Sequence, residues 1–427
     1  MTTRPFLLIT LLLLSGLLIA CAAPPPSPTV TLQRPNEPTL TPPFQAEPTP
    51  SPTAHPQPQA EEASLTPEDI TLDAGELADS WRAVSVPATP FDNLHAPGPS
   101  GLPAHFQILF NGLDDPRARE PGAPVIYIIP VDPYRQLWEE HDSRLVSDLI
   151  RRIADLSFKL PQPLPVRGLP VLPVEETFGV NDFATQVRQP SPQEASAAKS
   201  DYRFVGRFAQ DASPVTNEWQ RYIYQGFTND GRYLVAFFFP VRTDQLPDGI
   251  EAVSQAEQDA FAQDGLGYLA DKARALDALP SDAWEPDLAE LDALIASLQI
   301  EGMPETGLTE RSWVWVSQRA SGAEAPTPVL DPTAYEVTFA AEEVQVRADC
   351  KRTDGTYAAS SGLSGPLRLT LNPTTMQLCG ENSQADVFLS GLSQVQRFAM
   401  APGGHTLQFY LSDGSLMSFA QKPRGNE

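Results

Sequence analysis

Catalytic and metal-ligating side chains occur throughout this sequence, but their spacing matches no common reaction centre. There is no HExxH zinc motif, no GxSxG nucleophile elbow and no phosphate-binding P-loop. The five histidines are scattered, and no two have the spacing of metal ligands. They are His55, His95, His105, His141 and His405. Carboxylates are abundant but dispersed, although two could still meet in three dimensions. The sequence therefore predicts no catalytic residue, no metal ligand and no cofactor.

One stretch, Gly265 to Ala270, superficially fits a dinucleotide-binding fingerprint. It lies within helical periodicity and no strand precedes it, whereas the fingerprint needs a turn from a strand into a helix. We do not expect it to bind a nucleotide.

The first residues have the organisation of an export signal. Arg4 supplies a positive charge, Phe6 to Ile19 is almost entirely apolar, and the small residue Ala20 precedes Cys21. The apolar run is somewhat short for a membrane-spanning helix, which needs about 20 apolar residues. We predict that residues 1–20 are a signal peptide.

Around Cys21 the sequence resembles the lipobox of bacterial lipoprotein precursors. That motif has an aliphatic residue three positions before its cysteine and a small residue directly before it, and Leu18 and Ala20 fill these places. The resemblance implies that the Cys21 thiol receives a diacylglyceryl group and that Cys21 becomes the mature N-terminus. Two acyl chains attach a protein stably, because one chain binds membranes only marginally. An uncleaved membrane helix and an ordinary secretory signal are the alternatives.

Cys350 and Cys379 remain as an even pair once Cys21 is acylated. In an exported protein such a pair can form a disulfide. A bridge closing a loop of about 30 residues would contribute roughly 3–4 kcal/mol on the chain-entropy account. Two free buried thiols are the alternative.

The charge balance argues against nucleic acid as a partner. The chain has 54 Asp and Glu against 29 Lys and Arg, a formal net charge of −25. Phosphate recognition needs basic clusters, and the same charge opposes adhesion of the body to an anionic membrane. The length of 427 residues allows two or three domains.

Residues 21–68 are predicted to be the lipidated cysteine and a disordered Pro-rich linker. Proline recurs every few residues, as in Pro24-Pro25-Pro26 and in Glu47 to Pro52. Such a segment has too few apolar groups to fold, and proline favours extended conformations. At about 3.1 Å per residue it could span on the order of 140 Å. The more specific alternative to a linker is that a PxxP motif in this segment is bound by a partner protein.

Residues 69–250 are predicted to form an α+β domain with an antiparallel sheet. Strand patterns occur at 106–110, 125–129 and 202–208. Asp132 opens a helix that ends before Pro161, and the proline-rich but apolar loop that follows is expected to pack on the body. One face of this helix is apolar and the other is charged. The charged residues are Arg144, Asp148, Arg151, Arg152 and Asp155.

The clearest local signal of this domain is an aromatic hairpin. Residues 219–227 and 233–241 flank Asn229-Asp230-Gly231, and an Asp-Gly turn between such runs predicts a hairpin. Its aromatic side chains could form either a core, which is the commoner outcome, or a ligand-binding wall. The candidates for such a wall are Trp219, Tyr222, Tyr224 and Tyr233.

Residues 251–300 are predicted to be a helical pair. Ser254 to Glu257 has the capping-box pattern, and the helical stretch it opens continues to about Leu279, where Pro280 stops it. A second helix starts near Pro286. The pair could complete the first domain or separate it from the last.

Residues 311–421 are predicted to be β-rich. The expected strands are 313–316, 335–339, 343–347 and 367–371, followed by a short helix at 385–392 and a hairpin of 407–411 with 415–419. This order resembles that of the META domain family, which includes HslJ-like lipoproteins. The matching positions are Cys350, Gly355, Tyr357, Thr374, Met376 and Cys379. Lys351 departs from the usual asparagine, and Cys379 lies one residue later than the pattern.

The META resemblance covers about a quarter of the chain. It implies an antiparallel, β-rich domain linked to envelope stress, with no agreed catalytic activity to transfer.

Two main function hypotheses follow. The first is a lipid-anchored protein on the extracytoplasmic face of the cell membrane, a non-enzymatic binding or envelope-maintenance module whose partner is an envelope protein or peptide. The second is a hydrolase of envelope polymers with a catalytic site assembled in residues 69–250. A third has the first domain merely position the META-like domain. A deep cleft with paired carboxylates or a Ser/His pair would favour the hydrolase, and shallow grooves would favour binding.

Overall fold

The computed structural model describes residues 65–94, 99–174, 177, 180–189, 198–209, 212–304, 306–374 and 377–422. The chain divides into two units, Met1–Pro58 and Gln59–Glu427, and every described residue belongs to the second. The predicted signal peptide, Cys21 and the linker up to residue 64 lie outside the described residues. His55, His95 and Met376 also lie outside them.

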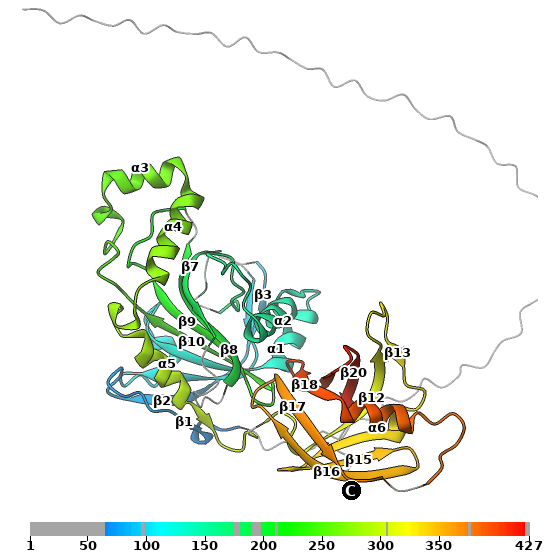
Figure 1. The fold of residues 1–427 in the computed structure, drawn as a ribbon. Coiled ribbons are helices and arrows are strands. Elements are labelled where there is room, and N and C mark those ends of the chain that lie inside the picture. The colour runs from blue at the N-terminus through cyan, green and yellow to red at the C-terminus, as the bar shows by residue number, and fades with distance from the viewer. Residues whose placement is uncertain are drawn as a thin grey trace, which may run out of the picture. The chain divides into compact units, whose positions relative to one another are not determined.

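An antiparallel sheet of seven strands organises the first part of the described chain (Figure 1). Its order is β2-β5-β6-β10-β9-β8-β7. The strands are β2 (Trp81–Val86), β5 (His105–Phe110), β6 (Val125–Pro130), β7 (Val180–Arg188), β8 (Ala198–Ala209), β9 (Arg221–Thr228) and β10 (Tyr233–Pro240). The central strands are buried on both faces, which explains their nearly continuous apolar sequences. The predicted aromatic hairpin is confirmed as β9 and β10.

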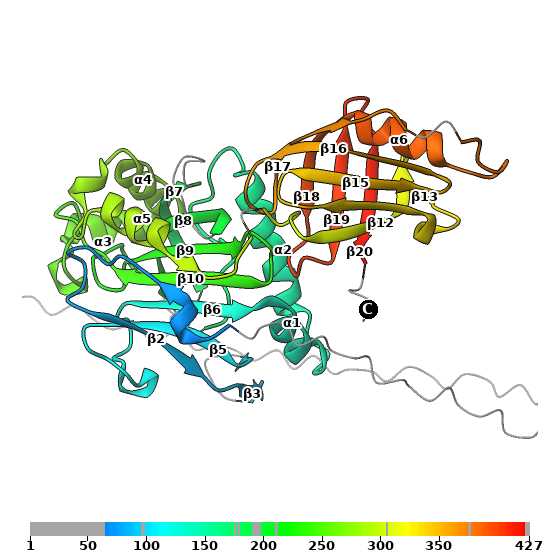
Figure 2. The same ribbon diagram turned by 90° about the horizontal axis from the view of Figure 1, so that it is seen from below.

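Two helices cover one face of this sheet (Figure 2). They are α1 (Val131–Glu139) and α2 (Leu145–Phe158), and the buried side chains of Trp138 and Ile153 bring them into the core of that face. One continuous helix was expected to start at Asp132 and to end before Pro161, and this expectation is wrong. The chain leaves the helical conformation at Asp142, whose φ of 57° is left-handed. The buried residues Val146, Ile150 and Ile153 of α2 nevertheless face the sheet, whereas Leu145 and Phe158 are more than a third exposed.

Three helices belong to the opposite side of the sheet. They are α3 (Gln255–Gln263), α4 (Gly265–Asp277) and α5 (Leu288–Ser297). The Asp264 side chain accepts a hydrogen bond from the backbone N–H of Gly267 at 2.9 Å, which ends α3 and starts α4 where one helix was expected. The buried leucines of α4 and α5 belong to the same hydrophobic cluster as the strands. Helices α4 and α5 therefore share the core of the sheet.

The proline-rich loop after α2 packs on the body, as the sequence predicts. Leu172 is fully buried, and the Pro170 carbonyl accepts hydrogen bonds from the Tyr202 hydroxyl and from Gln225 Nε2. Two small antiparallel pairs complete this part of the chain. They are β1 (Ile70–Thr71) with β11 (Gln299–Ile300), and β3 (Thr89–Asp92) with β4 (Ser100–Leu102).

The C-terminal part is a closed antiparallel sheet. Its strands are β12 (Arg311–Arg319), β13 (Thr327–Pro328), β14 (Tyr335–Phe339), β15 (Glu343–Ala348), β16 (Lys351–Ala359), β17 (Ser364–Leu371), β18 (Val395–Met400), β19 (Thr406–Leu411) and β20 (Leu416–Gln421). Strand β12 pairs with both β14 and β20, which closes an eight-stranded barrel, and β13 is added beside β12. The α+β class with antiparallel sheets is therefore confirmed.

Aromatic side chains fill the interior of this barrel. Trp313 and Trp315 of β12 are fully buried, and α6 (Ala385–Ser393) inserts Phe388 against Trp315 with ring centres 5.2 Å apart. The backbone N–H of Gln384, just before α6, donates to the Tyr335 hydroxyl at 2.8 Å. The barrel interior is thus a packed core.

A disulfide joins Cys350 to Cys379, with Cα atoms 5.5 Å apart. It ties the turn between β15 and β16 to the loop that precedes α6. The predicted bridge is confirmed. Among the described helices, none is both long and apolar enough to cross a membrane.

Candidate binding groove

The turn between β9 and β10 is organised around the buried carboxylate of Asp230. This side chain is 1% exposed. It accepts hydrogen bonds from the Thr228 hydroxyl at 2.7 Å and from the Arg232 backbone N–H at 3.1 Å, and it pairs with the Arg232 guanidinium. The Asp-Gly turn predicted from the sequence therefore also holds a buried charge. Burying a carboxylate without such partners would cost several kcal/mol.

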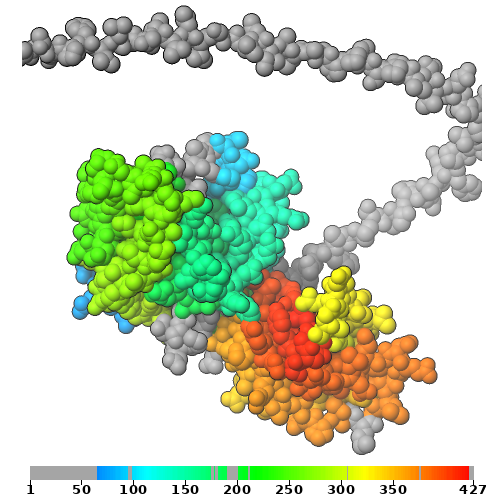
Figure 3. Space-filling model, turned by 45° about the horizontal axis from the view of Figure 1, so that its top comes forward, coloured from blue at the N-terminus to red at the C-terminus, as the bar shows by residue number. Residues whose placement is uncertain are grey.

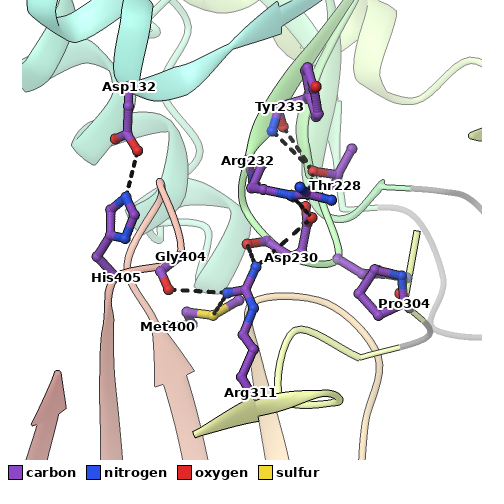
Figure 4. Close-up of polar contacts among 11 residues, drawn as sticks. Asp132, Thr228, Asp230, Arg232, Tyr233, Pro304, Arg311, Met400, Gly404 and His405 are labelled. Carbon is purple, nitrogen blue, oxygen red and sulfur yellow. Dashed lines mark hydrogen bonds and ion pairs between the residues drawn. The ribbon is translucent and has the colours of Figure 1, made fainter. Parts of the chain in front are cut away.

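Arg311 of β12 joins this turn to the barrel (Figure 4). Its side chain is 9% exposed, and its guanidinium lies 3.9 Å from the Asp230 carboxylate. It donates to the Asp230 carbonyl at 3.3 Å and to the Gly404 carbonyl at 3.1 Å. Gly404 has a left-handed φ of 76°, and a Cβ atom there would lie 2.6 Å from both the Arg311 Nη1 atom and the Asp230 carbonyl. Glycine is therefore required at this contact.

Two further contacts join the same segments. The backbone N–H of Gly403 donates to the Gly231 carbonyl at 2.9 Å. His405 Nε2 lies 2.6 Å from the Asp132 carboxylate in the first turn of α1 (Figure 4). Unlike Arg311, both of these side chains are substantially exposed. The first contact joins the turn between β18 and β19 to the turn between β9 and β10, and the second joins it to α1.

A groove of about 970 Å³ lies beside this junction, between the α1–α2 segment and the outer surface of the barrel. Figure 3 shows the teal surface of these helices meeting the red surface of the C-terminal strands. We call this feature the groove. The helical segment contributes Arg135, Glu139, Asp142, Arg144, Ser147, Asp148, Ile150, Arg151, Ala154, Asp155 and Phe158. The barrel contributes Leu363, Ser364, Ala399, Met400, Ala401, Pro402, Thr406, Gln408 and Tyr410.

The helical wall of the groove carries charges of alternating sign. Arg144, Asp148, Arg151 and Asp155 follow one another at intervals of four, three and four residues, which places them on one face of α2. Arg151 pairs with Asp148 at 2.8 Å. Among the residues that the structure describes, the Arg144 and Asp155 side chains have no hydrogen bond or ion pair. This wall therefore presents both signs of charge to a ligand.

A polar contact locks α1 to α2 at one end of this wall. The Ser147 hydroxyl donates to Glu139 Oε1 at 2.6 Å, and Arg135 Nε donates to the Ser147 oxygen at 3.4 Å. Arg135 also lies 3.8 Å from Glu139. A serine activated for nucleophilic attack needs an adjacent general base such as histidine. In this contact Ser147 instead donates to a carboxylate and positions the two helices.

Exposed apolar groups occupy other parts of the groove. Tyr410 of β19 and Phe158 at the end of α2 are large hydrophobic side chains more than a third exposed. The Arg397 guanidinium lies 4.4 Å from the centre of the Phe158 ring, a cation–π contact that holds the ring in place. Met400 adds a deformable thioether to the barrel side. Within the described residues, no histidine is hydrogen-bonded to a serine, threonine or cysteine.

The four aromatic residues proposed as a binding wall do not form one surface. Tyr222 and Tyr224 are fully buried, and their hydroxyls donate to Asp292 at 2.7 Å and to Asp201 at 2.5 Å. Burial raises the pKa of Tyr222 well above its ordinary value, and the nearby Asp292 raises it further. Tyr233 is half-buried. These two buried tyrosines belong to the core, because β9 and β10 are central strands with both faces covered.

Trp219 differs from its neighbours in the hairpin, because its side chain is 58% exposed. It precedes β9 in a loop and lines a second, smaller pocket. It is the member of the predicted aromatic set whose position leaves the ring accessible to a ligand.

The histidines within the described residues lie apart from one another. His105 is buried, with Nδ1 2.8 Å from the Pro103 carbonyl and Nε2 3.2 Å from Gln107 Nε2. Burial lowers the pKa of His105, and the contact with Pro103 partly opposes this. The His141 ring stacks on Phe91 with ring centres 4.7 Å apart. The described part of the chain contains no group of histidine, cysteine and carboxylate residues arranged to hold a metal ion.

Comparisons with known proteins leave the family of this chain open. No protein-family model matches it, and a search of curated proteins found no match. A solved structure of a protein from Burkholderia xenovorans is 22% identical to this chain, over 27% of this chain and 85% of the other. Its TM-score is 0.24, so this likeness carries no argument about fold or function.

Sequence reasoning missed the groove, although one of its components was visible. The charged face of the predicted helix contains Arg144, Asp148, Arg151 and Asp155. A charged helix face is usually a solvated surface, and nothing in the sequence placed it opposite β18 and β19. Strand β18 itself was not predicted.

Proposed function

We propose that this chain is a lipid-anchored, extracytoplasmic binding module of the cell envelope that holds a polypeptide ligand in the groove. The observation that carries the binding part is the composition of the groove. The groove has a volume of about 970 Å³, and its lining combines the alternating charges of α2 with the exposed side chains of Phe158 and Tyr410. Pockets that bind ligands are commonly found where two packed parts of a chain meet.

A polypeptide ligand suits this lining better than a nucleic acid. Arginine, aromatic residues and methionine are enriched in protein interfaces, whereas lysine is depleted. The groove contains three arginines, no lysine, and carboxylates between the arginines. This pattern would repel a phosphate backbone at the carboxylates, but it complements a segment that carries both signs of charge.

The location rests on the sequence around Cys21. The lipobox-like residues Leu18 and Ala20 and the preceding apolar run support export, lipid attachment and cleavage before Cys21. The Pro-rich linker would then act as a stalk between the membrane and the body. We also propose that residues 311–421 are a META-like domain. The order of Trp313, Cys350, Tyr357 and Cys379 along the chain supports this assignment.

The anchor is tested by metabolic labelling with a fatty acid. The natural chain should take up label and remain with the membrane fraction, whereas the Cys21→Ala variant should lose both label and membrane attachment. Equal labelling of the two proteins would contradict the anchor.

The binding role is tested by affinity capture of the mature protein from its own envelope. Arg151→Glu reverses one charge of the groove. Arg274→Glu is the matched control, because Arg274 also pairs with an aspartate three residues earlier at 2.8 Å on an exposed helix surface. A polypeptide captured by the natural chain and by the Arg274 variant, but not by the Arg151 variant, is the expected result. Identical capture by all three would contradict the groove as the site, and reproducible turnover of an envelope polymer would contradict a non-enzymatic role.

A further inference from the structure

The turn that carries Trp219 combines an unusual backbone conformation with an exposed ring. The backbone N–H of Gln220 donates to the Asn217 carbonyl at 3.2 Å, which closes a four-residue turn with Trp219 in its third position. Trp219 has a φ of 70°. Glycine or asparagine is favoured at such a position, and a bulky side chain there is an outlier. Because the indole is 58% exposed, packing in the core does not explain the tryptophan.

The indole forms part of a pocket of about 460 Å³, which we call the Trp219 pocket. Pro214, Thr216 and Ile250 are also among the residues that line it, and Ile250 is itself 47% exposed. The Arg221 guanidinium lies 5.9 Å from the centre of the Trp219 ring. Within the described residues the indole N–H of Trp219 has no hydrogen-bond partner. The pocket thus offers an aromatic face, apolar neighbours and a free donor.

We propose that the Trp219 pocket binds the chain's own Pro-rich segment between Pro24 and Pro58. This segment contains 13 prolines in 35 residues and includes two PxxP spacings, Pro25 to Pro28 and Pro35 to Pro38. Pro-rich segments dock against aromatic side chains, because the fixed φ of proline leaves little conformational entropy to lose. An extended proline helix has no internal hydrogen bonds. Its carbonyl groups can therefore accept a hydrogen bond from the indole N–H.

The covalent connection between the Pro-rich segment and the body favours binding of this segment in the Trp219 pocket. The segment is joined to the described body near Leu65, and at about 3.1 Å per residue its 35 residues reach roughly 110 Å when extended. A folded body of this size has a radius of gyration of about 20 Å, so the segment can reach the pocket. A tethered ligand has an effective concentration in the millimolar range. Even weak binding would then occupy the pocket and shorten the stalk.

A photo-reactive side chain at Ile250 tests this proposal in the full chain after its leader, with Cys21→Ser so that no lipid is attached. Ile250→benzoylphenylalanine places the probe in the pocket and keeps Trp219. After irradiation, mass spectrometry should find adducts to residues 24–58 within single chains. The same probe at Leu266 is the control, because Leu266 is 57% exposed on α4 and does not line the pocket.

Trp219→Gly separates binding from folding. Glycine suits a φ of 70°, so the variant should unfold at the same temperature as the natural chain or a higher one. It should also lower the yield of adducts from Ile250 at least fivefold. Three results would overturn the proposal: no adducts to residues 24–58, an unchanged yield in the Trp219→Gly variant, or adducts formed only between two chains.

Discussion

Arg311 in β12 donates to the main-chain carbonyl of Asp230 at 3.3 Å, and its guanidinium lies 3.9 Å from the carboxylate of the same residue. The two residues are 81 positions apart. One arginine of a barrel strand therefore supplies a hydrogen bond and a nearby positive charge to a buried turn of the seven-stranded sheet. The groove lies beside this junction, which helps to hold its two walls in place together with the His405–Asp132 contact.

The first prediction concerns this contact. Arg311→Ala should lower the free energy of unfolding by about 2–3 kcal/mol, because hydrogen bonds to charged groups contribute this much and Arg232 still pairs with Asp230. Chemical denaturation measures the change. Arg274→Ala removes an exposed pair and should cost no more than about 0.5 kcal/mol. Equal effects of the two substitutions would show that the junction does not depend on Arg311.

The second prediction concerns the groove wall. Arg151→Glu should change the free energy of unfolding by less than about 0.5–1 kcal/mol, because the pair with Asp148 is exposed on both sides. A large loss of stability, measured by the same denaturation, would mean that Arg151 supports the fold. In that case the variant could not be used to separate binding from folding.

The third prediction concerns the disulfide. Replacing Cys350 and Cys379 together with serine should lower the free energy of unfolding by roughly 3–4 kcal/mol on the chain-entropy account, since the bridge closes a loop with a sequence separation of 29. Thermal unfolding with and without reductant gives the same comparison in the natural chain. If the natural protein binds thiol reagents at both cysteines without reduction, the bridge is absent in solution.

The fourth prediction concerns His105. Because burial lowers the pKa of His105 below 6.5, its protonated form is disfavoured in the folded state. The unfolded chain then binds more protons as the pH falls below about 6.5, so stability is lost from there down to the folded-state pKa. His105→Gln should reduce the difference between the unfolding temperatures at pH 7 and pH 5. An unchanged difference in the His105→Gln variant would contradict the assignment.

The sequence predicted local elements well wherever periodicity and turn chemistry agreed. The β9–β10 hairpin follows from Asp230-Gly231, and the final hairpin of β19 and β20 follows from Asp413-Gly414. The prediction of helices from the sequence was wrong where a helix is interrupted at a residue other than proline. Asp142 takes a left-handed φ between α1 and α2, and the Asp264 side chain caps α4. Apolar residues recur at helical spacing before and after Asp142 and Asp264, so the sequence pattern did not indicate an interruption at either residue.

The candidate site was less predictable than the fold, for a geometric reason. Arg151 and Tyr410 line the same groove, but they are far apart in sequence and lie in different parts of the chain. Trp219 shows the opposite case. It was identified as a possible binding residue from its type, yet its exposure depends on a turn with a left-handed φ that no sequence pattern indicated.

The most direct test of the binding role is photo-crosslinking from the groove in intact envelopes. Tyr410→benzoylphenylalanine places the probe on the barrel wall, opposite the charges of α2. We predict one reproducible polypeptide adduct, whose yield falls at least tenfold when Arg151→Glu is added and is unchanged when Arg274→Glu is added. The absence of any polypeptide adduct, or equal yields with both charge reversals, would contradict the proposal that the groove holds a polypeptide ligand.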